Sequence, residues 1–221
     1  EYISEKGTSS VDGNAELKPT KVEITVPDDG KGYTVKAFAW NMTTLEPLCK
    51  HIEACEPIKL LIVGNSITKH APAPDIGWEH DWGMAATAES KDYVHQLAAK
   101  AKTVAPVELK MVNSYDFEMY FYDFTKFDTG KYQEFFDFEP DIIICTIGAN
   151  IKNPEPEGND GVLTDIQFNK DYYKNIIDFF NKNGKAKVIV GTTIFTPEGG
   201  EVQTGIKAYA DENSVPYVKM N

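Results

Sequence analysis

The chain has 221 residues, of which 42% are hydrophobic and 25% charged, so it can bury a sizeable core and is not a disordered polymer. Its 22 basic residues are all lysines and its 34 acidic residues give a net charge of −12. Because nucleic-acid sites depend on basic patches and on arginine, this composition argues against a nucleic-acid partner. No apolar run approaches the roughly 20 residues of a membrane span.

The first 56 residues are interpreted as a linker and a β-hairpin. Residues 1–20 show no periodicity, whereas Val22–Val26 and Tyr33–Trp40 have the alternation typical of two strands. Two strands do not form an independent domain, so the hairpin must either pack on the residues that follow or end a larger all-β module. We favour the second interpretation.

From residue 57 onwards, strands alternate with helices. Ile58–Gly64 and Asp141–Gly148 are nearly continuous apolar runs, as expected for strands buried on both faces. The other expected elements are Ser90–Lys102, Val107–Val112, Tyr132–Phe138, Asn169–Asn183, Val188–Val190, Val202–Glu212 and Val215–Val218. Strands separated by helices indicate parallel pairing, so residues 57–221 are predicted to form an α/β three-layer sandwich with a parallel five-stranded sheet.

Ligands of such sheets bind beyond the carboxyl ends of the strands, which places two loops at the predicted site. The first loop is Gly64-Asn65-Ser66, where a serine directly after a buried strand is exposed at the sheet edge as a nucleophile requires. On its own, this tripeptide is more simply a polar turn. The second loop is Gly148-Ala149-Asn150, which ends in an amide that can donate to an oxyanion.

Taken together, Gly64-Asn65-Ser66, Gly83 and Gly148-Ala149-Asn150 resemble the SGNH hydrolases, or GDSL-like lipases and esterases. The resemblance implies a flavodoxin-like sheet and ester hydrolysis through an acyl-serine intermediate. Ser66 would be the nucleophile, and its own N–H, the Gly83 N–H and the Asn150 amide would form the oxyanion hole. Trp78 and Trp82, which lie close to Gly83 in the sequence, are the predicted substrate contacts.

The chain departs from the family pattern at its end. The family carries an Asp-x-x-His block that supplies the base, whereas this sequence stops at Asn221 without one. We therefore expect that the last segment of the domain is missing from residues 57–221, and a serine without a base is a poor nucleophile. The histidines present are His51, His70, His80 and His95. Of these, only His70 and His80, in the loop after Ser66, could approach the serine as substitute bases.

No cofactor or metal is expected, because the three cysteines form no metal pattern. Cys49 and Cys55 are close enough to pair across a short loop, which spacing alone does not decide. The aromatic run Tyr115–Phe127 is either a sugar-stacking platform or core packing.

The sequence thus favours a secreted or cell-surface bacterial serine esterase, active on a small-molecule or polysaccharide ester such as an O-acetylated carbohydrate. Its other partners would be further domains of a longer chain. The alternative is a non-catalytic glycan-binding or cell-surface structural module that keeps the fold without the base.

Overall fold

The computed structural model describes residues 35–37, 52–54, 56–84, 86–151 and 168–219. The chain divides into two compact units, Glu1–Cys55 and Glu56–Asn221. The described part of the first unit is an antiparallel pair of short strands, β1 (Val35–Ala37) and β2 (Ile52–Ala54).

The predicted strand Tyr33–Trp40 overlaps β1, and among the described residues β1 pairs with β2, a strand that the sequence does not predict. Among the sequence predictions, the strand Val22–Val26, His51 and the pair Cys49 and Cys55 lie outside the described residues. The assignment of residues 1–56 to an all-β module stays a prediction.

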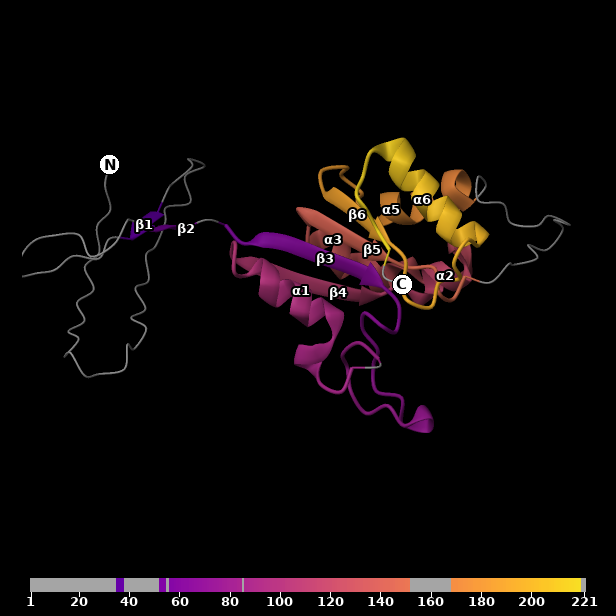
Figure 1. Cartoon of the computed structure of the whole chain (residues 1–221), viewed down its shortest axis with the longest axis horizontal. Coiled ribbons are helices and arrows are strands. Elements are labelled where there is room, and N and C mark those ends of the chain that lie inside the picture. The colour runs from indigo at the N-terminus through magenta and orange to yellow at the C-terminus, as the bar shows by residue number, and fades with distance from the viewer. Residues whose placement is uncertain (1–34, 38–51, 55, 85, 152–167, 220–221) are drawn as a thin grey trace, which may run out of the picture. The chain divides into compact units, whose positions relative to one another are not determined.

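The second unit is built on one sheet of five parallel strands, in the order β4-β3-β5-β6-β7 (Figure 1). The strands are β3 (Ile58–Gly64), β4 (Val107–Asn113), β5 (Ile142–Thr146), β6 (Lys187–Gly191) and β7 (Tyr217–Val218). In chain order this is the 2-1-3-4-5 arrangement of flavodoxin-like folds. The predicted fold class, an α/β sandwich on a parallel five-stranded flavodoxin-like sheet, is confirmed.

Helices lie on both faces of this sheet (Figure 1). In the described residues, the helices longer than four residues are α1 (Tyr93–Ala101), α2 (Tyr115–Met119), α3 (Gln133–Asp137), the π-helix η5 (Phe168–Tyr173), α5 (Lys174–Phe180) and α6 (Glu201–Asn213). Short 3-10 helices lie at Pro74–Ile76, Glu89–Lys91, Phe124–Lys126 and Thr129–Tyr132. The predicted helix Asn169–Asn183 thus begins as a π-helix, whose first and last side chains, Phe168 and Tyr173, are both fully buried.

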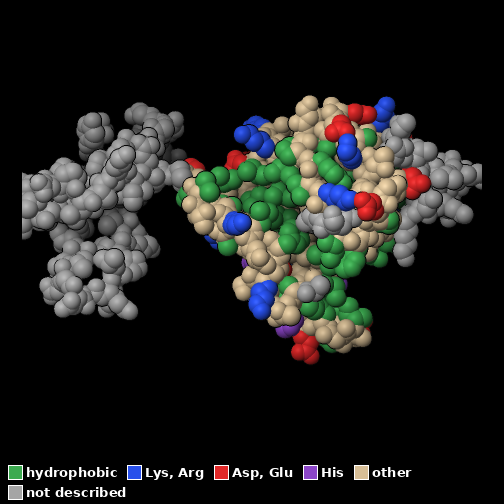
Figure 2. Space-filling view, in the orientation of Figure 1, with side chains coloured by type: hydrophobic (Ala, Val, Ile, Leu, Met, Phe, Trp, Pro, Cys, Tyr) green, Lys and Arg blue, Asp and Glu red, His purple; other side chains and the backbone are tan. Residues whose placement is uncertain are grey.

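The two faces of the sheet carry different cores, because side chains alternate along each strand. Leu61 and Val63 of β3 face the larger core, which they share with α5 and α6. Leu60 and Ile62 face the smaller core, with Val94 of α1. Figure 2 shows hydrophobic side chains gathered over the strands between α1 and α6.

The aromatic run packs into the larger core. Phe117 is fully buried and Phe121 is 2% exposed, and the Phe117 ring contacts five other aromatic rings at centroid distances of 4.7–5.0 Å. These two rings therefore offer no face to a sugar, and of the two interpretations of Tyr115–Phe127 the structure shows core packing for them.

Candidate active site

The direction in which strands are added to the sheet reverses between β3 and β5. Gly64 at the end of β3 is paired with Thr146 at the end of β5, so the loops that follow them begin side by side. This reversal is the position at which doubly wound sheets bind their ligands. It brings the two predicted loops to one edge of the sheet.

Ser66 lies in a tight turn that is stabilised by Asn65. The Asn65 carbonyl accepts the N–H groups of Thr68 at 2.9 Å and Lys69 at 3.1 Å, and its side-chain oxygen accepts the Ile67 N–H at 3.2 Å. Asn65 is buried whereas Ser66 is half-buried. Within the described part of the chain the Ser66 hydroxyl makes no hydrogen bond, so it stands at the rim of the sheet without an internal partner.

Gly83 is held beside Ser66 by its neighbour. The Met84 N–H donates to the Ser66 carbonyl at 2.8 Å, and the His70 N–H donates to the Trp82 carbonyl at 3.0 Å. A Cβ atom on Gly83 would lie 2.1 Å from the carbonyl oxygen of Ile67, so only glycine permits this approach. The structure therefore brings the predicted nucleophile and the predicted backbone donor together.

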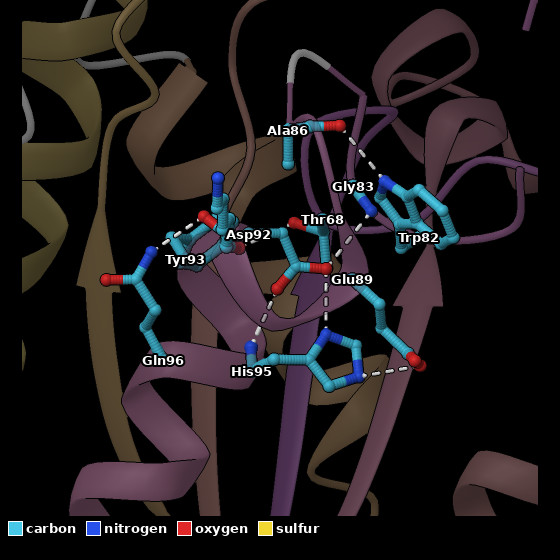
Figure 3. Close-up of polar contacts among 10 residues, drawn as sticks. Thr68, Trp82, Gly83, Ala86, Glu89, Asp92, Tyr93, His95 and Gln96 are labelled. Carbon is cyan, nitrogen blue, oxygen red and sulfur yellow. Dashed lines mark hydrogen bonds and ion pairs between the residues drawn. The ribbon is translucent and has the colours of Figure 1, made fainter.

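In this structure the Gly83 N–H donates to Oδ2 of Asp92 at 3.3 Å (Figure 3). Asp92, the N-cap of α1, also accepts the His95 N–H at 2.7 Å, and its Oδ2 contacts Nδ1 of His95 at 2.8 Å. Nε2 of His95 in turn lies 3.2 Å from Glu89. The Gly83 N–H is thus occupied by a carboxylate, and its role as an oxyanion donor stays a prediction.

Gly148 and Asn150 follow β5 on the second loop. Gly148 has a φ of 128°, and a Cβ there would also lie 3.0 Å from Val202 of α6, so the loop requires glycine on both counts. Its N–H donates to Oε1 of Glu118 at 2.6 Å, and the Asn150 amide Nδ2 donates to Oε2 of the same side chain at 2.6 Å. Asn150 is half-buried.

Glu118 is the site residue that sequence reasoning missed. It lies on α2, is 1% exposed, and also accepts from Nδ2 of Asn65 at 3.2 Å. One carboxylate therefore joins the loop of Ser66 to the loop of Asn150. A signal was available: an acidic residue in the middle of the aromatic run Tyr115–Phe127 is costly to bury unless N–H donors surround it.

The two loops are joined a second time by Tyr93 of α1. Its hydroxyl lies 2.5 Å from Oγ1 of Thr68 and 2.8 Å from Oγ1 of Thr146. Burial raises the pKa of the Tyr93 phenol, so the group stays a neutral hydrogen-bonding link.

Trp78 and Trp82 pack with His80 in the loop that projects from the sheet edge. The His80 ring stacks on Trp82 at a centroid distance of 3.9 Å, and the two indoles meet edge to face at 6.0 Å. Their indole N–H groups donate to the carbonyls of His70 and Ala86, which fixes both rings. Substrate contact by the two tryptophans stays a prediction.

Among the described residues, no histidine hydrogen-bonds to Ser66. His70 comes four residues after the serine, and its Nδ1 lies 2.6 Å from the Ala71 carbonyl. If Nδ1 donates to that carbonyl, Nε2 is the unprotonated nitrogen that a base requires. His80 is stacked on Trp82 and His95 is paired with two carboxylates, so His70 is the best candidate.

A third loop reaches the same edge after β6. A Cβ on Gly148 would lie 3.4 Å from Oγ1 of Thr196, so this loop is next to that of Asn150. It exposes the apolar side chains of Ile194 (54%) and Phe195 (58%).

In the described part of the chain, no group of three or more His, Cys, Asp or Glu side chains could hold a metal ion. No helix of that part is long and apolar enough to cross a membrane.

No protein-family model matches the chain, and no curated protein matches it. Similar solved structures include a protein named as a GDSL-like lipase from Parabacteroides merdae, with a TM-score of 0.42, 17% identity, and coverage of 75% of this chain and 78% of that one. A family two carbohydrate esterase from Cellvibrio japonicus has a TM-score of 0.39 and 21% identity over 78% of this chain. An acetyl xylan esterase from Butyrivibrio proteoclasticus has a TM-score of 0.37 and 17% identity over 77% of this chain.

The resemblance to the SGNH hydrolase family rests on the motifs Gly64-Asn65-Ser66, Gly83 and Gly148-Ala149-Asn150. The chain spans 55% and 58% of the lengths of the two esterases. Identities below 25% and TM-scores below 0.5 decide neither activity nor substrate, so the function has to be argued from the site.

Proposed function

We propose that the unit Glu56–Asn221 is a serine esterase of the SGNH type that hydrolyses an ester through an acyl-serine intermediate. The observation that carries the proposal is that hydrogen bonds hold the loops of Ser66, Gly83 and Asn150 together at one edge of the sheet. Met84 ties the serine to the Gly83 loop, and Glu118 ties it to the Asn150 loop. A nucleophile with backbone and amide donors around it is the arrangement that acyl transfer requires.

In the proposed reaction, Oγ of Ser66 attacks the ester carbonyl carbon and its proton passes to a base. The carbonyl oxygen becomes an oxyanion that accepts from the Ser66 N–H and the Asn150 amide. The carbon–oxygen bond to the alcohol then breaks, and the alcohol leaves with the proton. Water hydrolyses the acyl-serine in the same way and regenerates the hydroxyl.

We propose a carbohydrate ester outside the cell as the substrate class. Trp78 and Trp82 are supporting features, because indole faces pack well against sugar rings. The net charge of −12 favours a neutral over an anionic substrate.

One observation favours the binding module over the enzyme. No histidine of the described residues contacts Ser66, and binding requires no base. His70 is the candidate that would keep the enzyme interpretation.

The test is hydrolysis of p-nitrophenyl acetate by the whole chain and by Ser66→Ala, with Ser90→Ala, an exposed serine, as the control. The esterase proposal predicts that Ser66→Ala removes the activity above the lysine background, whereas Ser90→Ala keeps it. It also predicts that His70→Ala lowers the activity more than His80→Ala does. Equal rates in all variants would support the glycan-binding alternative. That alternative is then checked by titrating the chain with acetylated xylan oligosaccharides.

A further inference from the structure

Glu118 is a buried carboxylate at the centre of the site, and within the described residues it makes no hydrogen bond to Ser66 or Gly83. Oε1 accepts from Asn65 Nδ2 at 3.2 Å, from the Gly148 N–H at 2.6 Å and from the Asn150 N–H at 3.3 Å. Oε2 accepts from Asn150 Nδ2 at 2.6 Å. With 1% of its surface exposed, the carboxylate depends on these protein donors instead of water.

Four N–H groups around two oxygens suit an ionised carboxylate, which can only accept hydrogen bonds. This has a consequence for Asn150. Its side-chain amide has a donating end and an accepting end, and the contact at 2.6 Å to Oε2 requires the donating end to face Glu118. The amide is therefore fixed both in position and in orientation.

The Nδ2 group of Asn150 carries two hydrogens, and the bond to Glu118 uses one of them. The second hydrogen points away from the carboxylate. We propose that Glu118 is a positioning residue of the esterase site, which orients the Asn150 amide so that its second N–H is available to the oxyanion. This inference rests on the proposed function, since it assigns Asn150 the role of donor.

The variant Glu118→Gln tests the orientation at nearly constant volume. The glutamine keeps its oxygen toward the three donors on Oε1 and places its NH₂ group where Oε2 was, so it donates to Asn150. The Asn150 amide then has to turn its oxygen toward residue 118. We expect kcat for p-nitrophenyl acetate to fall by about 10- to 100-fold with little change in KM, as for a displaced catalytic group.

A double variant separates the loss of the Asn150 N–H from a loss of stability. In Glu118→Gln with Asn150→Asp, the glutamine donates to the carboxylate introduced at position 150, and every hydrogen bond around residue 118 is restored with one of them reversed. Residue 150 then has no side-chain N–H left for an oxyanion. The proposal predicts that the urea unfolding midpoint returns close to that of the unmodified chain while kcat stays as low as in the single variant.

Two outcomes overturn the proposal: kcat that recovers together with stability in the double variant, or kcat that is unchanged in Glu118→Gln while Ser66→Ala is inactive. Asp141→Asn is the control, because Asp141 also accepts a backbone N–H, from Lys59 at 2.9 Å, but at the opposite end of the strands. It is expected to leave kcat unchanged.

A readout independent of activity keeps the test valid if the proposed function fails, that is, if Ser66→Ala hydrolyses as fast as the unmodified chain. The side-chain amide signal of Asn150 is identified in a nitrogen-15 NMR spectrum as the one missing from Asn150→Asp. We expect it to shift in Glu118→Gln and to stay in place in Asp141→Asn. A signal that does not move in Glu118→Gln overturns the proposed orienting role whatever the activity.

Discussion

Two buried carboxylates lie at the carboxyl edge of the sheet and stabilise different kinds of structure. Glu118 is 1% exposed and takes its donors from segments 30 to 53 residues away in the chain. Asp92 is 3% exposed and takes its donors from residues three and nine positions away. Glu118 therefore fixes one strand-end loop relative to the other, whereas Asp92 shapes a single loop around Gly83.

The two centres also differ in their access to solvent. Among the described residues, the donors to Glu118 are all amide N–H groups, which do not change charge with pH. Asp92 contacts the imidazole of His95, which is 23% exposed and continues to the exposed Glu89. The comparison indicates that Glu118 holds Asn150 rigidly and that Asp92 holds the Gly83 loop less rigidly. Four further changes test this difference.

The largest effect is expected from Gly83→Ala. The new Cβ would lie 2.1 Å from the Ile67 carbonyl, and because that atom belongs to the backbone, the loop has to move away from Ser66. We expect p-nitrophenyl acetate hydrolysis to fall by roughly 100-fold. Gly200→Ala is the control, since a Cβ there meets its nearest neighbour at an ordinary 3.5 Å. Equal activity of the two variants would show that the Gly83 loop takes no part in the reaction.

Asp92→Asn should weaken the hydrogen bonds around Asp92 and leave those around Glu118 in place. An asparagine has one acceptor oxygen in place of two, so one of the N–H groups of Gly83 and His95 loses its partner. We expect a loss of about 1–3 kcal/mol in the free energy of unfolding, measured in urea. Asp211→Asn, which removes an exposed ion pair with Lys207, is expected to cost less than about 1 kcal/mol. A similar cost for both variants would contradict the structural role of Asp92.

Alkaline pH should destabilise the core behind Glu118. Burial, with the charge of Glu118 adding to it, raises the pKa of the Cys145 thiol from 9.0 to about 12. The unfolded chain therefore loses this proton first, and stability that is present below pH 9 declines as the pH rises toward 12. The decline is up to about 1.4 kcal/mol per pH unit for this group. Urea unfolding between pH 8 and pH 11 checks it, and Cys145→Ala should flatten the slope.

The smallest effect is expected from His95→Ala. The imidazole contacts to Asp92 and Glu89 are lost, but the backbone N–H of residue 95 still donates to Oδ1 of Asp92 at 2.7 Å, so Asp92 still caps the helix. Because the backbone contact to Asp92 is kept and the contact to the exposed Glu89 contributes little, the free energy of unfolding should fall by less than about 1 kcal/mol. A loss as large as that of Asp92→Asn would mean that the imidazole, not the backbone, supports the Gly83 loop.

The strands of the sheet can be predicted from the sequence because each is a short, continuous segment with its own apolar pattern. Ile58–Gly64 and Asp141–Gly148 are apolar runs whose burial on both faces follows from their composition, and β3 and β5 lie within them. Helix ends were less accurate. Ser90–Lys102 became α1 at Tyr93–Ala101, because the side chain of Asp92 caps the helix and accepts the His95 N–H.

The site was predictable only in part. Ser66, Gly83 and Asn150 follow from motifs in short segments, and the structure groups them, while their roles stay predictions. Glu118 was missed because its four donors come from positions that are distant in the chain. Only the folded sheet brings the residues after β3, β4 and β5 to one edge.

The most direct test of the account is to find the acyl group on the chain. The protein is mixed with p-nitrophenyl acetate, quenched in acid and digested, and the acetylated peptides are identified by mass spectrometry beside those of Ser66→Ala. The account predicts an acetyl group on Ser66 that forms faster than any acetylation of lysine and is absent from the variant. Acetylation of lysines alone, at equal rates in both proteins, would contradict the assignment of Ser66 as the nucleophile.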